Sequence, residues 1–320
     1  MRVVDAVEVQ EPDLQGKVEF FQGDIRDQAL MARAAQGMRW VVHSAAALPI
    51  SRAGREFYDV NVRGTRVVLE ASQAAKVERV VDLSSSAVYL GKSLPVPIDE
   101  NTELCPMGDY GESKLQAERV CEEFRARGLP VNILRSRTLV GSGRLGIFQI
   151  LFDWISNGKR IYILGPGDNR YQLCSASDMA EAVWLAATVP GVLNEDFCIG
   201  AGEFRTVRED LGSLIAHAGT PSRLCSIPPW FARAALGTLD ALRLSPLVDL
   251  HYKTPHKPFY FDIGKARRLL GYAPRQSNAQ MLAEAYDWYL QNRASYSSRY
   301  GKTHRSALKQ GLLKILHAVS

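Results

Sequence analysis

Short apolar runs alternate with longer segments of mixed polarity between residue 2 and about residue 200. The runs are rich in β-branched and aromatic side chains, which is typical of strands that are buried on both faces. The segments between them have the polarity pattern of helices, as in residues 64–75 and 114–127, the latter ended by Gly128 and Pro130, and a further helix is expected to open at Asp178. The pattern predicts strands at residues 2–5, 18–21, 39–42, 79–83, 131–134 and 197–200.

Strands that alternate with helices predict βαβ units, and therefore a parallel sheet covered by helices on both faces. In such α/β folds the chemistry lies in loops beyond the carboxyl ends of the strands. The serine run Ser84–Ser86 follows the strand at 79–83 directly, and the small residues of 43–47 follow the preceding strand. Small side chains at this position would let a flat cofactor ring approach the backbone.

A candidate acid/base pair lies downstream of the serine run. Tyr110 and Lys114 are four positions apart, which places them one turn from each other on the same face of a helix. An ammonium group beside a phenol favours the phenolate, so such a pair can take up and release a proton near neutral pH. The spacing alone also fits an ordinary surface pair, so its position after the serine run carries the hypothesis.

Further motifs occur in a fixed order between Arg2 and Asn292. They are residues 23–27 (Gly-Asp-Ile-Arg-Asp), 42–46 (Val-His-Ser-Ala-Ala), 61–65 (Asn-Val-Arg-Gly-Thr), 84–89, 98–100, Tyr110 with Lys114, and 265–274. In this order the chain resembles the extended short-chain dehydrogenase/reductases, which include the NAD-dependent epimerase/dehydratases and the 3β-hydroxysteroid dehydrogenase-like enzymes. The resemblance implies a Rossmann-like doubly wound sheet with a smaller C-terminal substrate lobe.

The resemblance also implies roles for single residues. Tyr110 would be the general acid/base on the substrate's carbinol or carbonyl oxygen, and Lys114 would support it and bind the nicotinamide ribose. The family's catalytic hydroxyl stands three positions before the Val of a Val-Tyr pair, which selects Ser85, with Ser86 as the runner-up. Its hydroxyl would bind the same substrate oxygen.

The cofactor implied by the resemblance is NAD. Asp5 holds the position of the acid that binds the adenosine ribose, and its carboxylate would repel the 2′-phosphate of NADP. His43 is more consistent with a packed loop residue than with a catalytic base. The cofactor-binding residues implied by the resemblance are Asp5, Asp24, Ile25, Ala45, Ala46, Asn61, Tyr110 and Lys114.

One family motif is missing from this sequence. The family begins with a strand and a Gly-x-x-Gly-x-x-Gly turn that binds the cofactor pyrophosphate, and no segment here supplies it. Without that central strand, we expect the second and fourth strands to face each other unpaired. The favoured explanation is a truncated N-terminus or a misplaced start codon. Two hypotheses follow: an NAD-dependent enzyme acting on a secondary alcohol, or a cofactor-deficient homologue that binds a ligand or partner.

We expect three regions. They are a dinucleotide-binding core at 1–201 with a substrate-side insertion at about 143–172, a substrate lobe at 202–292, and a basic tail at 293–320. The substrate stays open between a nucleotide sugar and a sterol-like alcohol. Arg170 is displaced by one position from where the sugar-nucleotide enzymes carry an arginine, while the apolar residues of 227–250 resemble the sterol-type branch.

Composition and charge narrow the classes further. The five cysteines have no Cys-x-x-Cys spacing and the histidines form no ligand pattern, which indicates free thiols in a reducing, cytoplasmic compartment and no metal site. Residues 291–320 hold six of the 39 basic residues and no acid, so the body is nearly neutral and nucleic acid is not an expected partner. Residues 307–320 could form an amphipathic helix on an anionic membrane, or dock on the body or on the second subunit of a homodimer.

Overall fold

The computed structural model describes residues 1–7, 14, 16–48, 54–241 and 254–297. All six strands expected from the sequence form within this part, each within two residues of its expected bounds. They are β1 (Arg2–Asp5), β2 (Glu19–Gln22), β3 (Trp40–His43), β4 (Arg79–Ser85), β5 (Val131–Ser136) and β9 (Asp196–Ile199). Every pairing among them is parallel, so the structure confirms the predicted α/β class.

The parallel strands form two separate groups. β1 pairs with β2, while β3, β4, β5 and β9 form a four-stranded sheet in that order. No backbone hydrogen bond joins β1 to β3 among the described residues, and Val42 of β3 is 47% exposed. The unpaired gap expected between these two strands is therefore present. By contrast, β4 and β5 are buried almost throughout, as expected for central strands of a parallel sheet.

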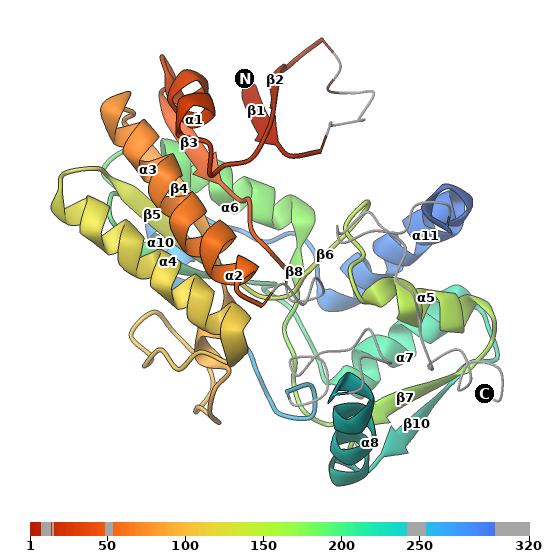
Figure 1. Cartoon of the computed structure of the whole chain (residues 1–320). Coiled ribbons are helices and arrows are strands. Elements are labelled where there is room, and N and C mark those ends of the chain that lie inside the picture. Colours follow the sequence, from red (N-terminus) through yellow and green to blue (C-terminus); the bar gives the residue numbers. More distant parts are fainter. Residues whose placement is uncertain (8–13, 15, 49–53, 242–253, 298–320) are drawn as a thin grey trace.

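Helices cover both faces of the four-stranded sheet (Figure 1). On one face, Leu69 of α3 and Val120 and Phe124 of α4 pack against β4 and β5. On the other face, Met179 and Ala182 of α6 pack in a second cluster, which α10 joins. The bounds are α1 (Gln28–Ala35), α2 (Glu56–Tyr58), the π-helix η3 (Asp59–Gly64), α3 (Thr65–Ala74), the 3₁₀ turn η4 (Ser86–Tyr89), α4 (Gly108–Ala126), α6 (Ala176–Thr188) and α10 (Gly264–Leu270).

Two helices begin earlier than the sequence indicated. The helix expected at 114–127 begins at Gly108, so α4 contains both Tyr110 and Lys114. The helix expected to open at Asp178 begins at Ala176, because the Ser175 hydroxyl accepts hydrogen bonds from the backbone N–H groups of Ser177 and Asp178 and caps the first turn. Both shifts involve local capping and turn geometry that hydrophobic periodicity does not report.

A second lobe lies beyond the carboxyl ends of β4 and β5, at the lower right of Figure 1. Its core joins the expected insertion to the C-terminal region, since Phe152 and Ile155 pack with Leu214 and Tyr286. Its elements are the pair β6 (Leu139–Val140) and β8 (Cys174–Ser175), α5 (Phe148–Ser156), the pair β7 (Arg160–Leu164) and β10 (Arg223–Ile227), α7 (Val207–Ala218), α8 (Pro229–Ala241) and α11 (Asn278–Ser297).

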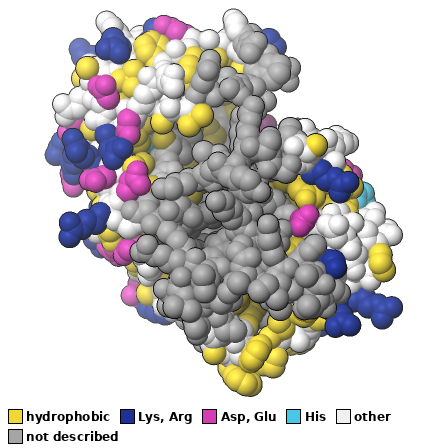
Figure 2. Space-filling model, turned by 45° about the vertical axis from the view of Figure 1, so that its right-hand side comes forward, with side chains coloured by type: hydrophobic (Ala, Val, Ile, Leu, Met, Phe, Trp, Pro, Cys, Tyr) yellow, Lys and Arg dark blue, Asp and Glu magenta, His cyan; other side chains and the backbone are white. Residues whose placement is uncertain are grey.

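The described surface carries charges of both signs. On the face in Figure 2, the coloured basic and acidic side chains are interspersed. Apolar side chains gather at its lower end, over α8, where Trp230 is 72% and Phe231 is 53% exposed. In the part of the chain that the structure describes, no helix is long and apolar enough to cross a bilayer. The amphipathic segment expected at 307–320 lies outside the described residues.

Candidate active site

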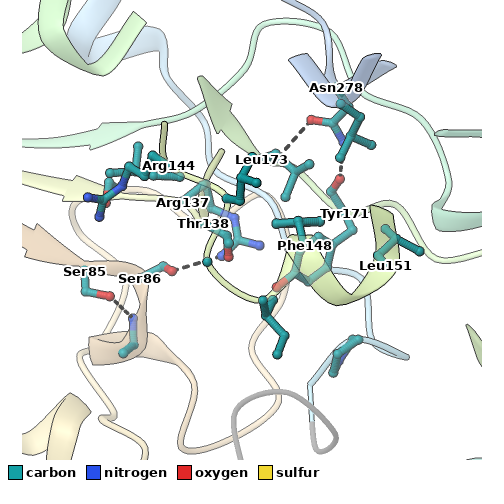
Figure 3. Close-up of a pocket in the computed structure, with 18 of the residues that line it drawn as sticks. Ser85, Ser86, Arg137, Thr138, Arg144, Phe148, Leu151, Tyr171, Leu173 and Asn278 are labelled. Atoms are coloured by element: carbon teal, nitrogen blue, oxygen red, sulfur yellow. Dashed lines mark hydrogen bonds between the residues drawn. The ribbon is translucent and has the colours of Figure 1, made fainter. Parts of the chain in front are cut away.

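A cavity of about 380 Å³ lies where the carboxyl ends of β4 and β5 meet the second lobe. Ser85, Ser86 and Tyr110 line it from the sheet side. Most of the remaining lining is apolar and comes from the second lobe, as with Phe148, Leu151 and Leu173 (Figure 3). The cavity therefore brings the predicted serine and tyrosine together beneath an apolar wall.

Tyr110 presents an unengaged hydroxyl to this cavity. Its ring packs edge-on against Phe57, with 6.0 Å between ring centroids. No described residue forms a hydrogen bond with its hydroxyl oxygen. The phenol is thus held by its ring while its hydroxyl remains available to a ligand.

Lys114 lies one turn further along α4 and is only 3% exposed. Its Nζ donates a hydrogen bond of 2.7 Å to the backbone oxygen of Leu83, at the carboxyl end of β4. No carboxylate of the described residues lies within salt-bridge distance of it. A buried ammonium that lacks its own anion stabilises negative charge on a neighbouring group, and Tyr110 is the neighbour on the same helix face.

The three serines have different partners. Ser84 donates to Glu118 at 2.5 Å, and Ser86 accepts a hydrogen bond of 3.0 Å from Nη1 of Arg137. Ser85 accepts from the backbone N–H of Ala87 at 3.2 Å, and no described residue accepts its hydroxyl proton. Ser84 is thus committed to Glu118, whereas neither Ser85 nor Ser86 has an acceptor for its hydroxyl proton among the described residues, so both can donate a hydrogen bond to a ligand in the cavity.

Buried polar contacts fix α4 against the sheet. Glu118, one turn beyond Lys114, accepts from Nη2 of Arg135 at 2.9 Å, and both side chains are 4% exposed. Arg135 also reaches Asp196 at 2.8 Å and the Tyr89 hydroxyl at 2.8 Å. Because Arg135 belongs to β5 and Asp196 to β9, this network sets the position of α4 relative to two strands.

Asn61 links the loop after β3 to the same helix. Its Oδ1 accepts from the backbone N–H of Ala47 at 2.8 Å, and its Nδ2 donates to the Ser113 hydroxyl at 2.9 Å. That hydroxyl in turn donates to the backbone oxygen of Tyr110 at 2.8 Å. Asn61, which lies in the π-helix η3, thus positions the loop containing Ala45 and Ala46 beside α4; such π-helical turns are frequent at functional sites.

The other residues expected to bind a cofactor lie elsewhere, at the ends of β1 and β2. The backbone oxygen of Asp5 accepts from Gly23 at 3.0 Å, so these two strand ends are adjacent. Asp24 forms a salt bridge of 2.6 Å with Arg26, whose hydrogen bond lowers the pKa of the Asp24 carboxyl. Ile25 is 8% exposed and packs in the core. None of the three lines the cavity.

The described residues fit a nicotinamide dinucleotide in part. The small residues Ala45 and Ala46 and the side chains of Tyr110 and Lys114 suit its nicotinamide end, and Asp5 is exposed at a strand end where a ribose hydroxyl could be bound. The described residues contain no glycine-rich strand-to-helix turn for the pyrophosphate.

His43 lies apart from the cavity. It is 5% exposed at the end of β3, and its Nε2 lies 2.9 Å from the Thr65 hydroxyl oxygen. Burial lowers the pKa of its imidazole to about 4. Among the described residues, no group of three or more His, Cys, Asp or Glu side chains could hold a metal ion.

Arg137 and Arg144 were assigned no role from the sequence, yet both line the cavity. Arg137 is 1% exposed and lies over the rings of Phe259 and Tyr171, at 4.2 and 4.7 Å from their centroids. The available signal was an arginine directly after the end of β5, but the direction of its side chain depends on the packing of the second lobe.

The chain is similar in sequence to a known protein family and to several known proteins. The model of the NAD dependent epimerase/dehydratase family matches residues 2–200. The uncharacterized protein y4nG of Sinorhizobium fredii is 43% identical over 300 residues, which cover 93% of this chain and 75% of that protein. The sterol-4-alpha-carboxylate 3-dehydrogenase (decarboxylating) of Mus musculus is 26% identical, with 81% and 76% covered.

A similar fold occurs in a solved structure. The dTDP-glucose 4,6-dehydratase DesIV of Streptomyces venezuelae, solved with NAD and TYD bound, is 27% identical and has a TM-score of 0.73. The match covers 93% of this chain and 89% of that one.

Proposed function

Because the chain belongs to the NAD-dependent epimerase/dehydratase family, we propose that it transfers a hydride between NAD and the CH–OH group of a secondary alcohol, with Tyr110 as general acid/base. The observation that carries this proposal is the unengaged Tyr110 hydroxyl in the same cavity as Ser85, one helical turn from the buried Lys114. These groups offer a proton acceptor, a hydrogen-bond donor and a fixed positive charge.

In the direction of oxidation, the Tyr110 phenolate accepts the proton of the substrate's carbinol. The Lys114 ammonium, held by the Leu83 carbonyl, stabilises the phenolate before that transfer. Ser85 donates a hydrogen bond to the same substrate oxygen and keeps it in line with the phenol. Bound NAD would accept the hydride from the carbinol carbon. In reduction, the same groups act in reverse, and the Tyr110 hydroxyl supplies the proton.

Cofactor specificity follows from the ends of β1 and β2. We propose that Asp5, Asp24 and Ile25 contact the adenosine part of NAD, and that Ala45, Ala46 and Asn61 form the nicotinamide side. The exposed Asp5 carboxylate would repel a 2′-phosphate, which supports NAD over NADP.

For the division of the chain into regions, we propose 1–201 as the cofactor-binding core and 202–292, with the insertion at 143–172, as the substrate lobe. The shared apolar cluster of the insertion and α7 and α11 supports this division.

A second candidate is a cofactor-deficient binding protein. The observation that favours it is the break between β1 and β3, together with the lack of a glycine-rich turn in the described part of the chain. Titration with NAD by calorimetry separates the two candidates. Saturable binding supports the enzyme, while no heat of binding and no turnover would favour the ligand-binding alternative.

The enzyme proposal is tested by following NADH absorbance with a panel of nucleotide sugars and sterol-like alcohols. With any alcohol that is oxidised, Ser85→Ala should lower kcat by about 10²-fold, the cost of losing one donor to a developing oxyanion. Ser142→Ala is the matched control, because Ser142 is exposed and bonds Glu284 instead. A Ser85→Ala variant with the kcat of the control would contradict the assignment.

A further inference from the structure

Arg144 occupies an unusual position in the cavity wall, in the turn between β6 and α5. Its backbone N–H donates to the Gly141 oxygen at 2.9 Å, which holds the turn. Its side-chain Nε is completely buried and has no hydrogen-bond partner among the described residues. No carboxylate in the described part of the chain lies within salt-bridge distance of its guanidinium. The residue as a whole is half-buried, and a guanidinium whose Nε is inaccessible and unpaired is costly unless a ligand supplies the missing acceptor.

The guanidinium lies at the reacting end of the cavity. Figure 3 shows Arg144 on the same side as Ser85 and Ser86, opposite Phe148 and Leu151. Arg144 and Tyr110 line the same cavity. Burial lowers the pKa of Arg144, and negative charge on Tyr110 opposes that shift. An anion bound by Arg144 would therefore sit close to the carbinol on which Tyr110 acts.

The residues that line the cavity supply little negative charge to balance the Arg144 guanidinium. Arg137 adds a second guanidinium, which is buried: its Nε donates to the Gln172 backbone oxygen, its Nη1 donates to the Ser86 hydroxyl, and its Nη2 has no partner among the described residues. Asp210 is the only acid among the described residues that line the cavity. Its Oδ2 already accepts from the Arg205 backbone and from Nδ2 of Asn278. The cavity thus has a surplus of positive charge at one end and apolar side chains elsewhere.

We propose that the substrate is an apolar secondary alcohol with a carboxylate close to its reacting carbinol, and that Arg144 binds this carboxylate. The planar carboxylate matches the fork of a guanidinium and would satisfy the orphan Nε. The apolar wall suits a hydrocarbon body, whereas the hydroxyls of a sugar ring would lose their hydrogen bonds against Leu145, Phe148 and Leu151. This inference rests on the proposed function, which gives Tyr110 its role.

Binding without cofactor tests the inference directly. We would titrate 3-hydroxydecanoate, its methyl ester and UDP-glucose into the full chain by calorimetry. The wild type should bind the acid about tenfold or more tighter than the ester. Arg144→Gln should lower affinity for the acid by about tenfold to a hundredfold, leave the ester within about twofold, and so remove the preference. Arg144→Lys should restore part of it.

Arg160→Gln is the matched control, because Arg160 is an exposed arginine at the start of β7. Thermal unfolding followed by circular dichroism shows that each variant is folded. Three results would each overturn the inference: no binding of the acid up to about 1 mM, no preference for acid over ester, or an unchanged preference in Arg144→Gln. Tighter binding of UDP-glucose than of the acid would do so as well.

The outcome is separable from that of the proposed function. An Arg144-dependent preference for the acid without NADH formation would support the ligand class and count against the enzyme. NADH formation with neutral alcohols that Arg144→Gln leaves unchanged would support the enzyme and overturn the ligand class.

Discussion

The buried imidazole of His43 should make folding stability depend on pH in a way that one substitution removes. His43 is 5% exposed, and its Nε2 lies 2.9 Å from the Thr65 hydroxyl oxygen. Because that hydroxyl donates to the Asn61 backbone oxygen, its oxygen can accept from the N–H of a neutral imidazole. Burial lowers the pKa of His43 from 6.5 to about 4; the Asp82 carboxylate opposes the shift and Lys114 adds to it.

The direction of this pH dependence follows from the number of protons that the folded and unfolded states bind. Between pH 6.5 and pH 4 the unfolded chain carries a protonated His43 while the folded protein keeps it neutral. The unfolded state therefore binds more protons, and the free energy of unfolding falls as the pH falls through this window. Each pKa unit corresponds to about 1.4 kcal/mol, so His43 alone should remove about 3 kcal/mol.

Urea unfolding of the wild type and of His43→Gln, followed by circular dichroism at several pH values, measures this contribution. The other titrating groups are the same in both proteins, so their effects cancel in the difference between the two unfolding free energies. That difference should shrink by about 3 kcal/mol on acidification, because only the wild type has the buried His43 imidazole. His217→Gln is the control, since His217 is 42% exposed and bonds Asp287 at the surface. A wild type–variant difference that does not change with pH would refute the reasoning.

Two further predictions concern the packing of α4 against the sheet, and a third, at Gly212 in α7, serves as their control. Glu118→Gln leaves Arg135 partly uncompensated in the interior and should lower the free energy of unfolding by about 3 kcal/mol in urea titrations; an unchanged midpoint would contradict the anchoring role. Gly111→Ala would place a Cβ 2.8 Å from the Ala87 backbone oxygen, so it should cost about 1–3 kcal/mol and lower turnover. Gly212→Ala, where a Cβ meets nothing within 4 Å, should instead stabilise by about 0.5–1 kcal/mol in the same assay.

The sequence predicted the strands well because each contains a short run of β-branched, aliphatic or aromatic residues, as in Val80–Val81 of β4 and Ile133–Leu134 of β5. It also placed Tyr110 and Lys114 on one helix face, and α4 contains both. The start of α4 was not predictable, since it depends on a left-handed backbone at Gly108, with φ of 62°. Helical periodicity carries no information about such a turn.

Only some of the residues that line the cavity could be predicted from the sequence. Ser85 could be predicted from its place at a strand end and from the family resemblance, and Tyr110 from its spacing to Lys114 and the order of the motifs around it. Arg144 could not, because its place in the same cavity as Tyr110 depends on how the turn after β6 packs between the sheet and the second lobe. Contacts between distant segments of this kind are a property of tertiary structure and leave no periodic signal in the chain.

The central claim is that Tyr110 transfers the proton. It is tested most directly by comparing kcat and NAD affinity of the wild type and Tyr110→Phe with an alcohol that the wild type oxidises. The substitution removes only the hydroxyl and keeps the ring against Phe57. We expect kcat to fall by about 10²–10⁴-fold, with the Kd for NAD unchanged within a few-fold. A Phe variant that binds NAD normally and keeps the wild-type kcat would contradict the account.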